Sequence, residues 1–458
     1  MELRRKEKLT VSIVDFGAKS GVEELQTASI QAAIDHCFQA GGGEVQIPEG
    51  EFYSGGIRLR SNVTLHLLKN AKLIGSRNCE DYFVLRDDKL EPVPAYILTP
   101  ENRINGRSLD GQHFGLRWYN SFIKAYHAKN IAIIGDEGSV IDGRDCYDAQ
   151  GEEEFRGPHC IGINECENIK YYGYTIVNSA NWAHMSWRCK NVFCENVTVI
   201  AGHDAFDVFA SNHVRVKNCT FHSGDDCIAG YDNQDVAVEN CDLSSSCSAF
   251  RFSGTHVRIK NCKVEGNSKY VHRYTLTKEE QITSVLLSDE ENPNHRYRMK
   301  SFYTYYGDNR LVIRKLPSDI VIENCEIANP EKLFHFNYSG SEQWSSNRPL
   351  GQIKLKNIKA KNLVLPMVAY GDKETPLDIT FENVTVGLED GYRDDCVFRT
   401  ANLKKMVLKN FSVENFKGKV LFRNYGMNNG RLVLKNVDGL CGVSIIEETT
   451  EPFTVDMI

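Results

Sequence analysis

A repeated unit, consisting of a short alternating strand, an asparagine and a second short strand, constrains the fold of this chain more than any other feature. The unit is clearest in KNVFCENVTV, NHVRVKNCTF, QDVAVENCDL, THVRIKNCKV and SDIVIENCEI, and it returns in LDITFENVTV, KKMVLKNFSV and GRLVLKNVDG. Its asparagines recur at steps of 22, 22 and 21 residues, and farther along at steps of 26 and 27. They are Asn196, Asn218, Asn240, Asn261, Asn357, Asn383, Asn410 and Asn436. A period of about 20–30 residues made of short strands indicates a parallel β-helix or a related β-solenoid.

The repeat also predicts how its members stack. Successive coils of such a solenoid lie about 4.8 Å apart, so equivalent residues form ladders along the axis. Asparagine tolerates the left-handed conformation of a sharp corner and can hydrogen-bond the next coil, so we expect a structural Asn ladder. Cys219, Cys241 and Cys262 follow the ladder at steps of 22 and 21 residues. We expect them to point inward as small apolar side chains and not to bind metal.

A chain of 458 residues suggests two or three domains unless its architecture grows by repetition. Because the repeat is present, we expect one β-helix domain over 1–458. A strand over Val11–Gly17 and a helix from about Gly21 to Ala40 are expected to form an N-terminal cap region, 1–60, whose helix covers the open end of the solenoid. The expected apolar stripe of this helix is Leu25, Ala28, Ala32, Ala33 and Phe38. Strands are expected in EVQIPEGEF and SNVTLHLLKNAKLIG.

A long interruption separates Asn261 from Asn324, which are 63 residues apart. The segment 265–317 is rich in charge and tyrosine, and we interpret it as a long loop insertion beside a cleft. One or two irregular coils are the alternative.

Composition limits the partners and the compartment. The formal charge is −7 and basic residues are scattered, so neither a nucleic-acid surface nor a polybasic membrane anchor is expected. No stretch approaches the roughly 20 apolar residues of a membrane span, and MELRRKEKLTVSIVDF lacks the apolar core of a secretory signal. Fifteen cysteines without CxxC pairs fit reduced thiols. These features favour a cytoplasmic protein, unless a leader has been removed, and leave the oligomeric state open.

Three aspartates in AGHDAFDVFASNHVRVKNCTFHSGDDCIAG are the leading candidates for chemistry. Asp204 precedes the pair Asp225 and Asp226 by 21 residues, about one coil, so the three carboxylates should meet on one face. Like-charge repulsion raises the pKa of at least one, which would then hold a proton. A carboxylic acid and a carboxylate flanking one bond are what glycoside hydrolysis requires. The plainer alternative is that aspartate is common in turns for structural reasons.

The chain resembles the polygalacturonase-like glycoside hydrolases of family 28, pectin-degrading enzymes on a right-handed parallel β-helix. The similar segments are VDFGAKS…TASIQAAIDHC…GGGEVQIPEGEF, GSVIDG, RGPHCIGINECENIKYYGYTIVNSANWAHMSW and, most specifically, CTFHSGDDCIAG. Three signatures differ. Gly202-His203-Asp204-Ala205 stands where the family has Asn-Thr-Asp-Gly, and Cys247-Ser248-Ala249 stands in place of Gly-His-Gly. For Arg-Ile-Lys we prefer Arg298-Met299-Lys300 over His272-Arg273-Tyr274.

The resemblance implies roles for these residues. Asp225 would protonate the glycosidic oxygen, while Asp204 and Asp226 would activate water in an inverting reaction. Five further residues are expected to contact the substrate: Arg298, Lys300, Arg251, His184 and His203. Arg298 and Lys300 could clamp a uronate carboxylate, although surface cations are usually only solvated. His184 could equally be a packed structural histidine. No cofactor and no metal are expected.

The expected function is hydrolysis of galacturonide, rhamnogalacturonan or related oligosaccharides, from a chain end because the long loop could close one end of the cleft. Two alternatives stay open. A lyase or epimerase on the same fold would bind Ca²⁺ through clustered aspartates and use a basic residue to remove a proton. A carbohydrate-binding solenoid without catalysis would explain the altered signatures.

Overall fold

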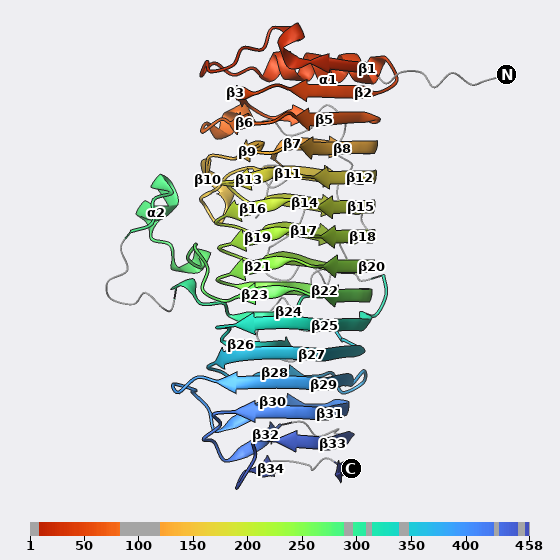
Figure 1. The fold of residues 1–458 in the computed structure, drawn as a ribbon, viewed down its shortest axis with the longest axis vertical. Coiled ribbons are helices and arrows are strands. Elements are labelled where there is room, and N and C mark those ends of the chain that lie inside the picture. The colour runs from red at the N-terminus through yellow and green to blue at the C-terminus, as the bar shows by residue number, and fades with distance from the viewer. Residues whose placement is uncertain are drawn as a thin grey trace, which may run out of the picture.

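The computed structural model describes residues 9–82, 120–287, 296–307, 314–338, 348–425, 430–447 and 454–457. In these residues the chain winds into a tall stack of coils whose strands pair in parallel with the coil before and the coil after (Figure 1). The expected parallel β-helix is therefore confirmed. No helix in the described ranges is both long and apolar enough to cross a bilayer.

Each coil contributes to three faces, which we call sheets A, B and C in the order in which a coil visits them. Sheet A contains the strands that follow the turns of Asp204, Asp225 and Asp226 and the equivalent turns of the other coils. Its members are β4 (Ile57–Arg58), β7 (Ser121–Tyr126), β11 (His159–Asn164), β14 (His184–Trp187), β17 (Phe206–Phe209), β20 (Ile228–Glu239), β22 (Ser248–Lys260), β24 (Ser301–Tyr305), β26 (Lys332–Asn337), β28 (Met367–Tyr370), β30 (Cys396–Ala401), β32 (Val420–Asn424) and β34 (Ser444–Glu447).

Sheet B comes next in each coil, and the long strands β20 and β22 run from sheet A into it. Its other members are β1 (Leu9–Ser12), β2 (Gly43–Ile47), β5 (Val63–Leu67), β8 (Lys129–Gly135), β12 (Glu167–Tyr172), β15 (Lys190–Glu195), β18 (Asn212–Lys217), β25 (Ser318–Ala328), β27 (Gln352–Leu363), β29 (Leu377–Leu388), β31 (Leu403–Glu414), β33 (Arg431–Asp438) and β35 (Thr454–Met457).

Sheet C closes each coil, and β25, β27, β29 and β31 bend from sheet B into it. Its short strands are β3 (Gly50–Ser54), β6 (Ala71–Gly75), β9 (Val140–Asp142), β13 (Thr175–Val177), β16 (Thr198–Ala201), β19 (Thr220–Ser223), β21 (Asp242–Ser245) and β23 (Lys263–Glu265). One further strand, β10 (Tyr147–Glu152), belongs to none of the three faces. The inward side chains of all three sheets form one continuous apolar core.

The asparagine ladder occupies the corner between sheets B and C. Asn240 has a left-handed backbone (φ 56°), donates its side-chain amide to Asn218 at 3.3 Å and accepts that of Asn261 at 3.1 Å. The same contact continues from Asn261 through the later asparagines to Asn436. A second ladder, which the sequence analysis did not single out, joins asparagines at the corner between sheets A and B, from Asn62 to Asn191. Cys219, Cys241 and Cys262 are buried beside the first ladder, as expected.

The ladder makes a prediction about stability. Asn240→Ala removes two amide contacts and places a Cβ-bearing residue without a polar side chain at positive φ, so we expect a loss of about 1–3 kcal/mol in the free energy of unfolding. Asn240→Gly loses the same contacts but tolerates the backbone, so its urea midpoint should lie between those of alanine variant and parent. A glycine variant less stable than the alanine variant would contradict this assignment.

The N-terminal cap differs in detail from the prediction. The strand ends at Ser12 and a 3₁₀-helix, Ile13–Phe16, follows, so a strand through Gly17 was wrong. The helix α1 (Thr27–Gln39) lies across the first coils (Figure 1). Of the expected stripe only Ala33 is buried. The buried face is Ile30, Ala33, Ile34 and Cys37, because the helix starts later than the glycine-rich approach suggested.

An excursion leaves the stack after β23 and returns at β24 (Figure 1). Its described part contains a 3₁₀-helix, Arg273–Thr275, and the helix α2 (Lys278–Thr283), which begins with a capping box between Thr277 and Glu280. The excursion is shorter than the predicted 265–317, because β24 already pairs with β22 and β26 as an ordinary sheet A strand.

Candidate active site

Three buried carboxyl groups meet at the turns that lead into sheet A. Asp204 precedes β17, and Asp225 and Asp226 precede β20, one coil later. An oxygen of each lies within 4.8 Å of the others. The backbone N–H of Asp226 donates to Oδ1 of Asp204 at 3.0 Å, and the backbone N–H of Ala205 donates to the carbonyl of Asp226 at 3.0 Å. The predicted gathering of these residues is therefore observed.

The register differs by one residue from the expected one. Phe206 pairs with Ile228 and Asp207 with Ala229, a step of 22, so Asp204 stacks on Asp226 rather than on Asp225. The closest oxygens of the three carboxyl groups lie within 4.8 Å of one another. This distance is shorter than the roughly 6.5–9.5 Å between the two carboxyl groups of inverting glycosidases. An inverting course therefore rests on the resemblance and not on the spacing.

Three arginines bind the acids. Oδ2 of Asp225 lies 2.5 Å from Nη1 of Arg273 and 3.4 Å from Nη2 of Arg156. Oδ2 of Asp226 lies 3.3 Å from Nη1 of Arg251, which comes from β22 of the following coil. Arg156 and Arg273 also share Glu153. Arg251 thus lies beside the carboxylates as predicted, whereas Arg156 was missed.

Burial and these contacts shift the pKa values of the carboxyl groups in opposite directions. Burial, reinforced by the neighbouring carboxylates, raises the pKa of Asp204 well above its usual range. Burial likewise raises the pKa of Asp226 and that of Asp207, a fourth buried carboxyl in β17. Burial also opposes ionisation of Asp225, yet the guanidiniums of Arg273 and Arg156 lower the pKa of Asp225 below its usual value. These directions agree with the expectation that at least one acid holds a proton, and they favour Asp204 over Asp225 as its carrier.

His203 lies beside the cluster and faces a small cavity. Its ring packs 5.7 Å from that of Phe155, and its Nδ1 is buried without a hydrogen-bond partner among the described residues. Burial lowers the pKa of His203 well below its usual range, so the imidazole is neutral. The cavity holds about 80 Å³ between the coils and the excursion, where Tyr270 and Val271 also line it. His203 is therefore placed near the acids, as predicted.

His184 lies in the core and does not face the site, which corrects its predicted substrate contact. It pairs in register with Ile161, an interior residue of β11. Its Nε2 lies 2.9 Å from the hydroxyl of Tyr174, and its Nδ1 lies 3.0 Å from the carbonyl oxygen of Ala205. The structural alternative for His184 is the one observed.

Arg298 and Lys300 do not form the predicted clamp. Arg298 precedes β24, two coils beyond the acids. Its Nη1 lies 2.7 Å from Glu389, and its guanidinium also donates to the carbonyl of Asn362. Lys300 pairs with Glu331 at 3.0 Å. Of the two matches to Arg-Ile-Lys, the less favoured one, His272-Arg273-Tyr274, is placed at the site, where Arg273 pairs with Asp225.

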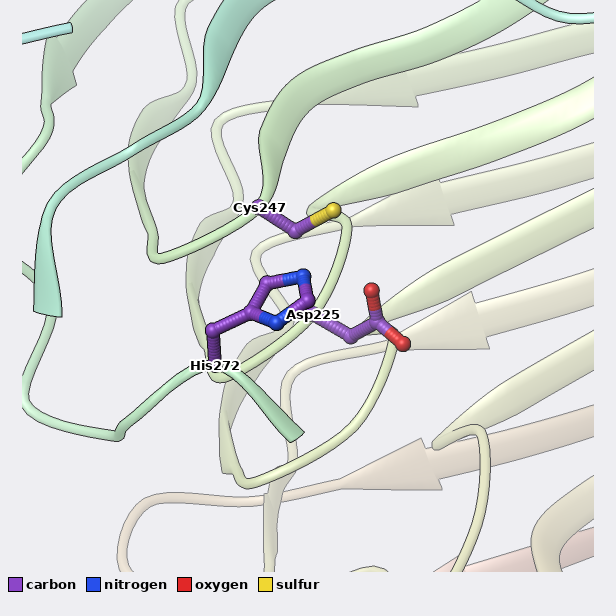
Figure 2. Close-up of side chains that lie close together, drawn as sticks. All are labelled: Asp225, Cys247 and His272. Carbon is purple, nitrogen blue, oxygen red and sulfur yellow. The ribbon is translucent and has the colours of Figure 1, made fainter. Parts of the chain in front are cut away.

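Two further groups at the site were not anticipated. His272 and Cys247 approach Asp225 from the excursion and from the turn before β22, and potential ligand atoms of these three residues lie within 4.8 Å of one another (Figure 2). Cys247 follows from the repeat, because the step of 22 residues between β20 and β22 stacks it on Asp225, whereas His272 comes from the excursion, whose path has no counterpart in the repeat. Another group, Asp394, Asp395 and Cys396, lies several coils away and is paired with Arg399 and Arg423.

The carboxyl cluster on one face of the parallel β-helix offers acid and base groups of the kind that glycoside hydrolysis requires. Residues 111–249, which include all three acids, match the sequence profile described as Glycosyl hydrolases family 28. The resemblance is thereby confirmed over these central coils.

Named relatives agree with the profile. A probable polygalacturonase of Vitis vinifera is 26% identical over 222 residues, which are 46% of this chain and 42% of the relative. An exo-poly-alpha-D-galacturonosidase of Dickeya chrysanthemi is 42% identical over 135 residues, 29% of this chain and 19% of the relative. This chain thus matches less than half the length of either relative.

A solved structure confirms the fold over almost the whole chain. The family 28 exopolygalacturonase of Yersinia enterocolitica superposes with a TM-score of 0.62 at 16% identity, covering 97% of this chain and 79% of that one. The handedness of the β-helix, predicted to be right-handed, agrees with such neighbours.

Proposed function

We propose that this chain hydrolyses glycosidic bonds of pectin-type oligosaccharides, galacturonides or rhamnogalacturonans, with the cluster of Asp204, Asp225 and Asp226. The observation that carries the proposal is the meeting of three buried carboxyl groups, one of which, Asp225, is paired with two arginines. An acid and a base that touch the same bond are the requirement for this reaction. The family match over the same residues supports the sugar substrate.

The charges favour a definite assignment of roles. Asp225, held as an anion by Arg273 and Arg156, is suited to activate water, because its Oδ1 is buried without a hydrogen-bond partner among the described residues. Asp204, whose pKa is raised well above its usual range, is suited to protonate the leaving oxygen, and the raised pKa of Asp226 favours the same role for it. This reverses the roles that the resemblance implies for Asp225 and its neighbours.

The excursion supports action at a chain end. It crosses beside the carboxyl cluster and is tied to preceding coils, since Ser268 donates to the carbonyl of Ser223 at 2.8 Å and Lys278 to that of Glu154 at 3.4 Å. Asp225 and Asp226 are only 2% and 1% exposed, so substrate has to displace covering side chains. A site closed in this way accepts the end of an oligosaccharide more readily than the middle of a polymer.

A product screen tests the proposal. Purified protein is incubated with oligogalacturonides and with rhamnogalacturonan oligomers, and the products are separated by size over time. We expect one class to be shortened stepwise with early release of a mono- or disaccharide. Random intermediate lengths would contradict end action, and no release from either class would contradict the pectin assignment.

We also propose that the chain works in a reducing compartment, in line with the cytoplasmic expectation. All fifteen cysteines are free thiols, and all but Cys79 and Cys441 are buried. Fractionation of the native host with an antibody against the chain tests this point, and recovery outside the cytoplasm would contradict it.

A further inference from the structure

Asp225, Cys247 and His272 converge from three separate segments of the chain on one small volume. Figure 2 shows the thiol, one imidazole nitrogen and the carboxylate turned towards a common point. One potential ligand atom of each lies within 4.8 Å of the other two, and all three residues are at most 8% exposed. Ligands of one tetrahedral zinc ion, each about 2.0–2.3 Å from it, lie roughly 3.3–3.8 Å apart. The three ligand atoms would therefore have to draw closer together to bind one ion.

We propose that Asp225, Cys247 and His272 form a binding site for a thiophilic divalent cation, Zn²⁺, with an open fourth position, and that the bound ion blocks the carboxyl cluster. Thiolate, imidazole and carboxylate are the ligand types that zinc combines in proteins. Mg²⁺ and Ca²⁺ require sets of six or more oxygen ligands, which this group does not offer.

The ligand atoms of Asp225 and His272 make few contacts, and Sγ of Cys247 accepts a contact of 3.9 Å from Oγ of Ser248. Both arginines at Asp225 contact Oδ2, while Oδ1 is buried without a hydrogen-bond partner among the described residues. Nδ1 of His272 accepts only a long contact, 3.4 Å, from the backbone N–H of Tyr274.

Charge balance makes the site exchangeable and not a permanent metal centre. Binding converts the Cys247 thiol to a thiolate and releases its proton to solvent, while the imidazole keeps its single proton on the nitrogen that faces away from the ion. The added charge of +2 is offset by one thiolate and by Asp225, which Arg273 and Arg156 already share. We therefore expect weaker binding than at a structural zinc site, where such cations are absent.

The consequence for catalysis rests on the proposed function. An ion on Oδ1 of Asp225 occupies the atom assigned to activate water, so Zn²⁺ should inhibit hydrolysis reversibly, with recovery on addition of a chelator. For each variant, inhibition is measured as the ratio of its rates with and without Zn²⁺. This ratio does not depend on the basal rate of the variant.

The direct test is spectroscopic and needs no activity. The full-length chain carrying Cys441→Ser, which removes the exposed thiol, is stripped with a chelator, kept reduced and titrated with Co²⁺. We expect one ion per chain with a thiolate-to-cobalt charge-transfer band, and displacement of that band by Zn²⁺. Cys247→Ser should abolish the band, and His272→Ala should weaken binding at least about tenfold. Cys241→Ser, a buried thiol of the interior stack, is the matched control and should change neither.

The outcomes separate the two proposals. Absence of the band in the parent, or its persistence in Cys247→Ser, overturns the metal site whatever the enzyme assay shows. A cobalt band without any hydrolysis of pectic oligomers keeps the metal site and overturns the proposed function. Circular dichroism spectra of the variants that match the parent establish that the coil is intact.

Discussion

Asp225→Asn is expected to lower the rate of oligosaccharide hydrolysis by about two to four orders of magnitude, the usual contribution of general acid or base catalysis. The amide keeps the shape of the side chain but can neither accept a proton from water nor carry the charge that Arg273 and Arg156 hold. Initial rates on the best substrate of the product screen measure the effect.

The control for this variant is Asp242→Asn. Asp242 lies in the same coil, at the start of β21, is exposed, and lies 3.4 Å from His222. It should retain the parent rate. A value for Asp225→Asn within tenfold of the parent, with both variants folded, would remove Asp225 from the reaction.

Arg273→Ala is expected to move the acidic limb of the pH–rate profile to higher pH. Arg273 is the closest cation to Asp225, at 2.5 Å, and it lowers the pKa of that carboxyl by favouring its anion. Without it the pKa of Asp225 rises, so a base that must be ionised is lost at a higher pH than before. A nearby opposite charge shifts a carboxyl pKa by about 1–3 units, which sets the size of the expected shift.

Arg273→Lys serves as the matched variant, because it keeps the charge while changing the hydrogen-bond geometry. Its acidic limb should lie closer to that of the parent than to that of Arg273→Ala. An acidic limb that stays in place or moves to lower pH in Arg273→Ala would contradict the assignment of the ionised form to Asp225. The full profile of kcat/KM against pH is the required measurement.

The sequence repeat was sufficient to predict the stack of coils, since its asparagines and cysteines lie where their spacing placed them. The step of 22 residues in the asparagine ladder is also the observed register of the acids, in which Asp204 stacks on Asp226. Counting instead from Asp204 to Asp225 misplaced the pair by one residue. Periodic features were therefore predictable because each coil repeats the same turn chemistry.

Two kinds of feature were harder to predict from the sequence: which side chains of a strand point inward, and where the residues of the excursion lie. His184 and Met185 are neighbours in β14, and only the register decides which of them points inward. A histidine in a strand gives no local signal of its face, so its burial beside Tyr174 appeared only in three dimensions. Arg273 and His272 lie outside the repeat, where no spacing argument applies, and the motif match to Arg298 selected the wrong cation.

The product of the reaction in ¹⁸O-labelled water tests the central claim most directly. Hydrolysis by the carboxyl cluster predicts saturated products in which each new reducing end carries one solvent oxygen, detected by mass spectrometry soon after cleavage. Proton NMR of the same mixture gives the anomer that forms first and so tests the inverting course. Unlabelled products with an unsaturated sugar at the new end would show a lyase, and unchanged chain length with altered sugar configuration would show an epimerase; either result would contradict the account.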